Sequence, residues 1–415
     1  MCKFTSCSKC GAKYCNGCAL SISTDTPLPS GYSSQCPESV INCFFVNLYY
    51  NCELRSLSNV FVDISYCYFN QSNMDLQSNY VSAKIAENIA EELSIPIGTG
   101  ITIAAKAWGP NNSKFKVLGL HGWLDNANTF DVIGPVMASS GIRMICVDFI
   151  GHGRSPHKPT WCNLYYTDYI TQVVDVADAL GWKTFSIVGH SMGAGIGSIV
   201  AATVPHMVEK IVCLDFIGLM SREQDQLQAI QIAMASRDSL IKRKPFLYPS
   251  RESIVEKLKS NNPFISDDAA RRLLARSIET VISPSGDQMY KLRHDPRLVG
   301  PSIFTMREHE VLVMLKSISC PVMLIWGTVS AQQFGMKKNW PEVMEKRMEC
   351  IKNLETLQCQ GSHHFHLENI SSFIDRLINF VKENQEINFS PPPNTFVSQE
   401  NHNQLAEAGL PKSNI

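Results

Sequence analysis

The 415-residue chain has neither a long apolar segment nor a dominant sign of charge. No apolar run reaches the about 18 residues that a membrane-spanning helix needs. The first residues lack the apolar core of a secretory signal, and the last three, Ser-Asn-Ile, are not the peroxisomal address Ser-Lys-Leu. The net charge of −1 argues against a dedicated nucleic-acid-binding protein or a polybasic membrane anchor. By default, we expect a cytoplasmic protein.

Cysteine is sparse after residue 80 and abundant before it. Nine of the 15 cysteines lie in the first 80 residues. The pairs Cys7/Cys10 and Cys15/Cys18 have the spacing of zinc half-sites, but only four residues separate them. Zinc modules usually place about 12 or more residues between the pairs, so that the chain can fold back. We therefore expect no metal site, and we interpret residues 1–80 as a poorly ordered extension.

Beyond residue 80, short apolar segments alternate with segments compatible with helices. This alternation predicts a parallel sheet covered on both faces, and thus an α/β fold. Between residues 216 and 315 the alternation stops, and apolar residues at helical spacing behind capping serines predict an all-helical insertion. From about residue 386 the chain is polar and proline-rich, which predicts a disordered tail over 389–415. The expected strands are 116–120, 143–148, 185–188, 210–214, 321–327 and 355–359.

The most informative motif is Gly-His-Ser-Met-Gly at residues 189–193. A strand candidate precedes it and a helix-compatible run, 194–204, follows, so Ser191 is expected at the apex of a strand–turn–helix. Glycines two residues on either side leave room for the neighbouring strand and helix, and the strained turn exposes the serine hydroxyl. Because the carboxyl ends of parallel strands meet at one edge, where ligands bind, Ser191 is the predicted nucleophile.

Other motifs occur in a fixed order around this one: His-Gly-Trp-Leu-Asp-Asn-Ala at 121–127, Asp-x-x-Gly-His-Gly-x-Ser at 148–155 and Gly-Ser-His at 361–363. Together they resemble the α/β-hydrolase superfamily, and the first phrase looks most like the serine hydrolase-like, kraken-type proteins. The resemblance covers about residues 97–388. It implies an α/β-hydrolase core of residues 81–215 and 316–388, with residues 216–315 as a cap inserted after the sixth strand.

A serine hydroxyl becomes a good nucleophile only when a base takes its proton. The base is expected on the loop after the last strand, where His363, His364 and His366 lie close together in sequence. The resemblance favours His363, which occupies the histidine of Gly-x-His. His364 would point to the opposite side of an extended segment, and His366 is interpreted as a surface or packing residue. His190 and His152 are interpreted as structural.

The acid of a catalytic triad is missing from its usual place. In the phrase Trp-Gly-Thr-Val-Ser at 326–330, Ser330 stands where such hydrolases usually carry an aspartate. No aspartate occurs anywhere in residues 296–374. This absence is the one feature that favours a catalytically impaired protein.

Two other carboxylates are candidates for this role. Asp215 ends the sixth strand, and some α/β-hydrolases take their acid from that position. Glu342 lies near the start of the next helix. A strand-end aspartate can also be a loop residue that caps a turn. We predict Asp215, because the chain order Ser191, Asp215, His363 is still nucleophile, acid, base.

Acyl transfer also needs two backbone N–H groups aimed at the developing oxyanion. One is predicted to belong to Met192, directly after the nucleophile. By the family resemblance the other belongs to Trp123, with its indole lining the substrate pocket. Asp125, in the same loop, is interpreted as a cap for the following helix. Asp148 and Arg154 are interpreted as architectural.

The sequence therefore predicts a serine hydrolase acting on a small-molecule carboxylic ester, thioester or lipid-like ester, with no metal or organic cofactor and no nucleic-acid partner. Haloalkane dehalogenases and epoxide hydrolases use aspartate at the nucleophile position, so Ser191 argues against both. The alternative is an impaired hydrolase-fold protein that binds a ligand or partner. The remaining motifs argue against it, because a fold kept only for binding need not retain them.

Overall fold

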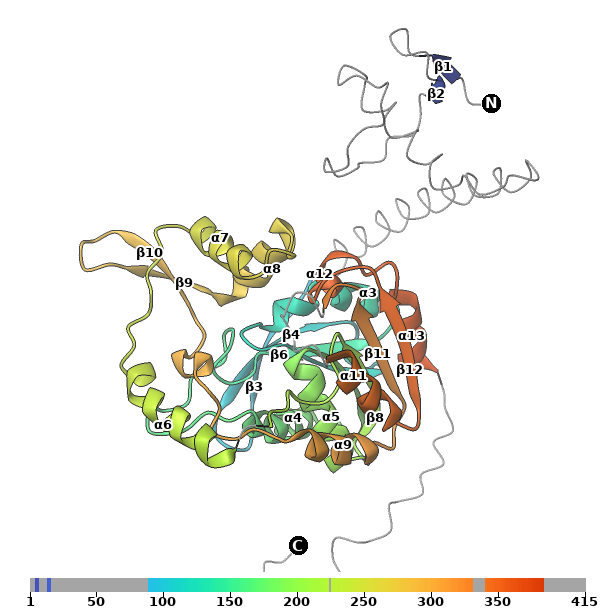
Figure 1. The fold of residues 1–415 in the computed structure, drawn as a ribbon, viewed down its shortest axis with the longest axis horizontal. Helices are drawn as coiled ribbons and strands as arrows, with labels where there is room; N and C mark the ends of the chain where they lie inside the picture. The colour runs from blue at the N-terminus through green and yellow to red at the C-terminus, as the bar shows by residue number, and fades with distance from the viewer. Residues whose placement is uncertain (1–3, 7–12, 16–88, 224, 331–339, 384–415) are drawn as a thin grey trace, which may run out of the picture. The chain divides into compact units, whose positions relative to one another are not determined.

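The computed structural model describes residues 4–6, 13–15, 89–223, 225–330 and 340–383 (Figure 1). The chain divides into two units, Met1–Asp75 and Leu76–Ile415. In the first unit, β1 (Phe4–Ser6) and β2 (Lys13–Cys15) pair as antiparallel strands. Cys7, Cys10 and Cys18 of the zinc half-sites, most of the predicted extension and the predicted tail lie outside the described residues.

The described residues of the second unit form an eight-stranded sheet in the order β12-β11-β8-β7-β5-β6-β4-β3. Its strands are β3 (Glu91–Pro96), β4 (Thr102–Trp108), β5 (Lys116–Leu120), β6 (Arg143–Val147), β7 (Phe185–His190), β8 (Val208–Leu214), β11 (Val322–Gly327) and β12 (Leu354–Cys359). The pairs β3–β4 and β4–β6 are antiparallel, and the others are parallel. The expected parallel strands are confirmed, whereas β3 and β4 were not predicted. Ile95 is the single buried residue of β3, and β4 alternates buried with less buried residues up to Ala107, so neither reads as a continuous apolar run.

Helices cover both faces of this sheet. Leu118 of β5 and Ile187 of β7 pack into one apolar cluster, while their neighbours Val117 and Val188 pack into the other. The helices on the first face are α4 (Thr167–Ala179), α5 (Met192–Thr203), α9 (Glu308–Lys316) and α11 (Trp340–Glu349). Those on the second are α3 (Ile133–Ser139), α12 (Phe365–Glu368) and α13 (Ile374–Lys382). No helix in the described ranges is long and apolar enough to cross a membrane.

The insertion lies between β8 and β11, as expected. Its helices are α6 (Gln226–Ile241), α7 (Arg251–Asn261) and α8 (Asp267–Ser277), drawn beside the core in Figure 1. Ser250 and Ser266 cap α7 and α8 by accepting hydrogen bonds from backbone N–H groups of the first turn.

The expectation that the insertion contains only helices is wrong. Directly after α8, β9 (Ile278–Ile282) and β10 (Gln288–Leu292) form an antiparallel hairpin. The first strand, Ile-Glu-Thr-Val-Ile, is rich in β-branched residues, and the connecting turn contains Pro284 and Gly286. The helix α9, of which all but the last residue falls inside the predicted range 216–315, packs against α5 through Val311 and Leu315 and so belongs to the core.

Candidate active site

The predicted nucleophile lies on a strained turn between β7 and α5. Ser191 has φ 52° and ψ −115°, in the left-handed region that favours glycine. A Cβ on Gly189 would come within 2.6 Å of the Ala194 backbone, and one on Gly193 within 2.0 Å of the Leu120 carbonyl oxygen. Only glycines therefore allow this turn. The Ser191 N–H donates to Leu214 O (3.1 Å), which places the serine beside the end of β8.

Asp215 follows Leu214, and the fold brings it to His363. Asp215 Oδ2 lies 2.5 Å from His363 Nδ1, although 147 residues separate the two in the chain. Both side chains are buried. Burial raises the pKa of Asp215 to about 6, opposed by hydrogen bonds from Ser330 and Gly327. Burial, with nearby His364, holds the pKa of His363 well below its ordinary value, which favours the neutral imidazole that a base requires.

Ser330 takes part in this arrangement in a way that sequence reasoning missed. Its hydroxyl donates to Asp215 Oδ1 (2.5 Å), and the backbone N–H of Gly327 donates to the same oxygen (2.9 Å). Ser330, at the usual position of the acid, thus contacts the carboxylate that directly follows β8. Glu342, the alternative acid, lies in the first turn of α11.

The two predicted oxyanion donors belong to two segments next to the serine. Met192 begins α5, where backbone N–H groups have no acceptor within the helix. The loop that carries Trp123 also approaches the nucleophile, because a Cβ on Gly122 would lie 3.3 Å from Ser191 Cβ. The Trp123 side chain is 53% exposed, and its indole N–H donates to Leu298 O (3.0 Å) in η2 (Pro296–Val299) of the insertion.

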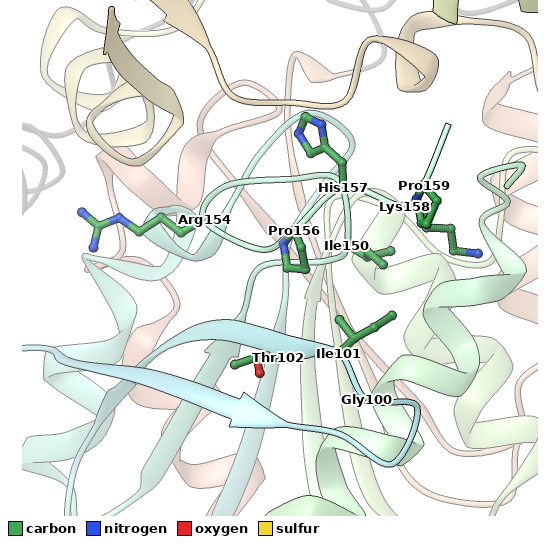
Figure 2. A pocket seen from close by; sticks show the side chains of 9 residues that line it. All are labelled: Gly100, Ile101, Thr102, Ile150, Arg154, Pro156, His157, Lys158 and Pro159. Carbon is green, nitrogen blue, oxygen red and sulfur yellow. The ribbon is translucent and has the colours of Figure 1, made fainter. Parts of the chain in front are cut away.

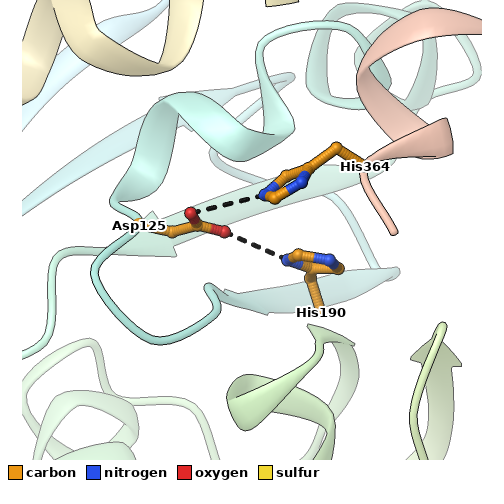
Figure 3. Close-up of side chains that lie close together, drawn as sticks. All are labelled: Asp125, His190 and His364. Carbon is orange, nitrogen blue, oxygen red and sulfur yellow. Dashed lines mark hydrogen bonds and ion pairs between the residues drawn. The ribbon is translucent and has the colours of Figure 1, made fainter. Parts of the chain in front are cut away.

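A buried cluster of histidines surrounds Asp125 next to these groups (Figure 3). Asp125 Oδ2 lies 3.1 Å from His190 Nδ1, and Asp125 Oδ1 lies 3.5 Å from His364 Nε2. The other ring nitrogen of His190 lies 3.0 Å from the backbone oxygen of His363. The interpretation of Asp125 as a helix cap is therefore wrong, and Asn126 caps the next helix instead. His190 keeps a structural role, since it fixes the backbone of the predicted base.

Charge in this cluster is divided unequally. Burial lowers the pKa of His190 to about 4, so His190 is neutral at physiological pH. Burial alone would also lower the pKa of His364, but the Asp125 carboxylate outweighs it and raises that pKa. Burial opposes ionisation of Asp125, yet His364 and His190 together hold the pKa of this carboxyl well below its ordinary value. Ligand atoms of Asp125, His190 and His364 lie within 4.8 Å of one another, so these three residues could hold a metal ion.

The remaining predicted residues have structural positions. His366 is fully buried and pairs with Thr129 Oγ1 (2.8 Å), so the suggestion of a surface residue is wrong. His152 is buried against His121, with 4.9 Å between the ring centroids. Asp148 is fully buried and accepts from Arg154 N (2.7 Å) and from Arg276 Nε of α8 (2.7 Å). Asp148 thus ties the insertion to the core.

Two cavities lie in the described part of the second unit. One, of about 460 Å³, lies between the turn that joins β3 to β4 and residues 154–159 (Figure 2). The other, of about 690 Å³, has walls from the core and from the insertion, and Leu124 of the Trp123 loop is among its lining residues. The Trp123 indole, expected to line a substrate pocket, lines neither of these two cavities, and the same holds for Ser191 and His363.

Comparison with known proteins gives concordant results. The family described as "alpha/beta hydrolase fold" matches residues 117–234. A serine hydrolase-like protein of Dictyostelium discoideum is 63% identical over 336 residues, which cover 78% of this chain and 94% of the relative. A serine hydrolase-like protein of Danio rerio is 30% identical over 71% of this chain and 89% of the relative. A crystal structure of a hypothetical protein from Pseudomonas aeruginosa is 30% identical with a TM-score of 0.60, covering 70% of this chain and 97% of that one.

Proposed function

Because this chain belongs to the serine hydrolase-like proteins of the α/β-hydrolase superfamily, we propose that it is an active serine hydrolase that cleaves a carboxylic ester, thioester or lipid-like ester. The single observation that carries the proposal is the 2.5 Å contact between Asp215 Oδ2 and His363 Nδ1. This contact supplies the acid that the phrase at residues 326–330 lacks. A small molecule is the proposed substrate, in the range of carboxylesterase- and lipase-like enzymes.

The proposed mechanism is acyl transfer through Ser191. A proton on Nδ1 of His363, directed at the Asp215 carboxylate, leaves Nε2 as the nitrogen that can accept a proton. His363 takes the hydroxyl proton as Ser191 attacks the carbonyl carbon, and it then donates that proton to the leaving group. Water, activated by the same histidine, hydrolyses the acyl-enzyme. The backbone N–H groups of Met192 and Trp123 are proposed to stabilise the oxyanion of each tetrahedral intermediate.

The alternative function, a hydrolase fold that only binds a ligand or partner, rested on the serine at position 330. The hydrogen bond from Ser330 to Asp215 weakens that argument, because it gives the serine a role beside an acid. A fluorophosphonate probe tests the two alternatives without knowledge of the substrate. We expect wild-type protein to be labelled and Ser191→Ala to be unlabelled with an unchanged Tm. Equal labelling of both proteins would contradict the assignment of Ser191, and labelling of neither would favour the binding protein.

A further inference from the structure

The larger cavity, of about 690 Å³, has an unusual balance of charge. Its lining residues include six Lys and Arg side chains and a single carboxylate, that of Glu279. The chain as a whole carries a net charge of −1, so the excess of positive charge is a local property of this cavity. The six cationic residues are Arg154, Arg243, Lys244, Lys257, Lys291 and Arg293.

Among the residues that the structure describes, two of the six have an acidic partner. Arg154 pairs with Glu92 (3.2 Å), and Lys291 pairs with Glu279 (3.5 Å). The other four, Arg243, Lys244, Lys257 and Arg293, pair with no carboxylate in the part of the chain that the structure describes. Surface cations on a nearly neutral protein are usually interspersed with acidic residues. Four uncompensated cations around one cavity instead attract an anion and raise its local concentration.

The chemistry of these groups favours phosphate over a single carboxylate. One carboxylate neutralises one positive charge, whereas a phosphate carries close to two negative charges and several acceptor oxygens. Arg243 and Arg293 supply guanidinium groups, which bind phosphate oxygens through two parallel hydrogen bonds. His294 also lines the cavity, and burial lowers its pKa, with smaller contributions from His157 and Arg243 that Asp295 opposes.

The walls of the cavity include one loop of the candidate active site and the end of α7, which contacts another. Leu124 lines the cavity and directly follows Trp123, the proposed oxyanion donor. Asn261 also lines it, and the next residue, Asn262, lies 3.3 Å from the ring of His364, beside the proposed base. A molecule in the cavity would therefore contact the loop of the proposed oxyanion donor and the end of the helix that packs against His364.

We propose that this cavity binds the phosphate-bearing part of the substrate, so that the enzyme acts on esters or thioesters that carry a phosphate group away from the reacting carbonyl. This proposal rests on the proposed serine hydrolase function. It adds a specificity site formed by the insertion, with Arg243, Lys257 and Arg293 as the binding residues. Binding energy from the phosphate would position the acyl group at Ser191.

A binding experiment tests the site independently of catalysis. Inorganic pyrophosphate is titrated by calorimetry into the full-length Ser191→Ala protein and into the same protein with Arg243→Gln and Lys257→Gln. The matched control carries Lys242→Gln and Lys316→Gln, two exposed cations outside the cavity lining. We expect Kd to rise at least tenfold in the cavity variant and less than twofold in the control. If the cavity variant melts below the control, Lys244→Gln/Lys257→Gln replaces it. Absent binding, or equal Kd in both variants, would overturn the proposal.

A kinetic experiment separates this proposal from the proposed function. Butyryl-phosphopantetheine and butyryl-pantetheine present the same thioester and differ by one phosphate. We expect wild-type kcat/KM to be at least tenfold higher for the phosphorylated substrate, with the ratio falling toward one in Arg243→Gln/Lys257→Gln but not in the control. A wild-type ratio of one, with both thioesters hydrolysed, refutes the phosphate site alone. No hydrolysis of either thioester, together with no fluorophosphonate labelling, refutes the serine hydrolase instead.

Discussion

The substitution Asp215→Asn examines the candidate triad most directly. One oxygen of Asp215 accepts hydrogen bonds from Ser330 Oγ and Gly327 N, and the other faces His363 Nδ1. In the variant, the amide oxygen must stay with the two donors, because an NH₂ group there would leave both without an acceptor. The NH₂ group then faces Nδ1 and donates to it. This arrangement moves the histidine proton to Nε2, the nitrogen that must accept the proton of Ser191.

The expected effect of this tautomer change is large. Removal of a triad acid typically lowers turnover by about 10³ to 10⁴. This range corresponds to about 4 to 5.5 kcal/mol of lost transition-state stabilisation. The assay is kcat/KM on p-nitrophenyl butyrate, with the rate of fluorophosphonate labelling as a second measurement. Glu342→Gln is the matched control. It should leave kcat/KM and the labelling rate nearly unchanged, because Nδ1 of His363 already has Asp215 as its partner.

The fold should survive the substitution. The pKa of Asp215 in the folded protein, about 6, lies above its ordinary value of 3.8, so folding disfavours the ionised form. The contribution of this group to stability is complete below its unfolded pKa and is lost as the pH rises through about 6. At pH 7 this contribution is already lost in the wild-type protein, so a neutral asparagine removes nothing further. We therefore expect a Tm no lower than that of wild type.

Two further observations complete this test. Wild-type kcat/KM should fall as the pH drops through about 6, because protonated Asp215 no longer orients His363, and this acid limb should disappear in Asp215→Asn. Adding Ser330→Asp to Asp215→Asn should restore part of the activity, since the Ser330 hydroxyl lies 2.5 Å from Asp215 Oδ1. Near-wild-type activity in Asp215→Asn with collapse in Glu342→Gln would reverse the assignment of the acid. Little change in both would refute the reasoning altogether.

Three other predictions address the surroundings of the site. Ser330→Ala removes a hydrogen bond to the ionised Asp215, and such a bond is worth about 1.5–3 kcal/mol. The pKa of Asp215 should therefore rise, and the acid limb of the pH–rate profile should move up by about 1 to 2 pH units. An acid limb at the wild-type pH would contradict this. Arg276→Met leaves the buried Asp148 carboxylate without its ion pair and should lower the free energy of unfolding by about 3–5 kcal/mol in urea titrations. Arg272 forms an exposed ion pair with Asp268, so Arg272→Met should lower the free energy of unfolding by at most about 1 kcal/mol. An equal loss of stability in Arg276→Met and Arg272→Met would refute the comparison. A protein beginning at Val81 should fold and keep full esterase activity, because the strands of the hydrolase sheet begin at β3. If only the full-length chain bound zinc stoichiometrically, the N-terminal segment would instead be a real module.

The parallel part of the fold was predictable because its signals are local. A buried parallel strand reads as a short apolar run, and each run from 116–120 to 355–359 became a strand with bounds within about three residues. The turn at Ser191 was equally clear, since the glycines that it requires stand at fixed positions in one short motif, although the clash that requires Gly193 is with the distant Leu120. The hairpin β9–β10 escaped prediction because its first strand continues without a break from the helix α8.

The sequence by itself therefore determined the α/β core, the position of the serine and the place of the insertion, all of which follow from the order of apolar runs and glycines. Only the tertiary structure decided which carboxylate meets His363, because the choice depends on how the ends of β8 and β11 lie side by side. The same is true of Ser330 and Asp125: each acts through a partner more than 60 residues away, and no spacing in the chain encodes that contact. Strand order is set by packing across the whole sheet, so these contacts become visible only when the sheet is assembled.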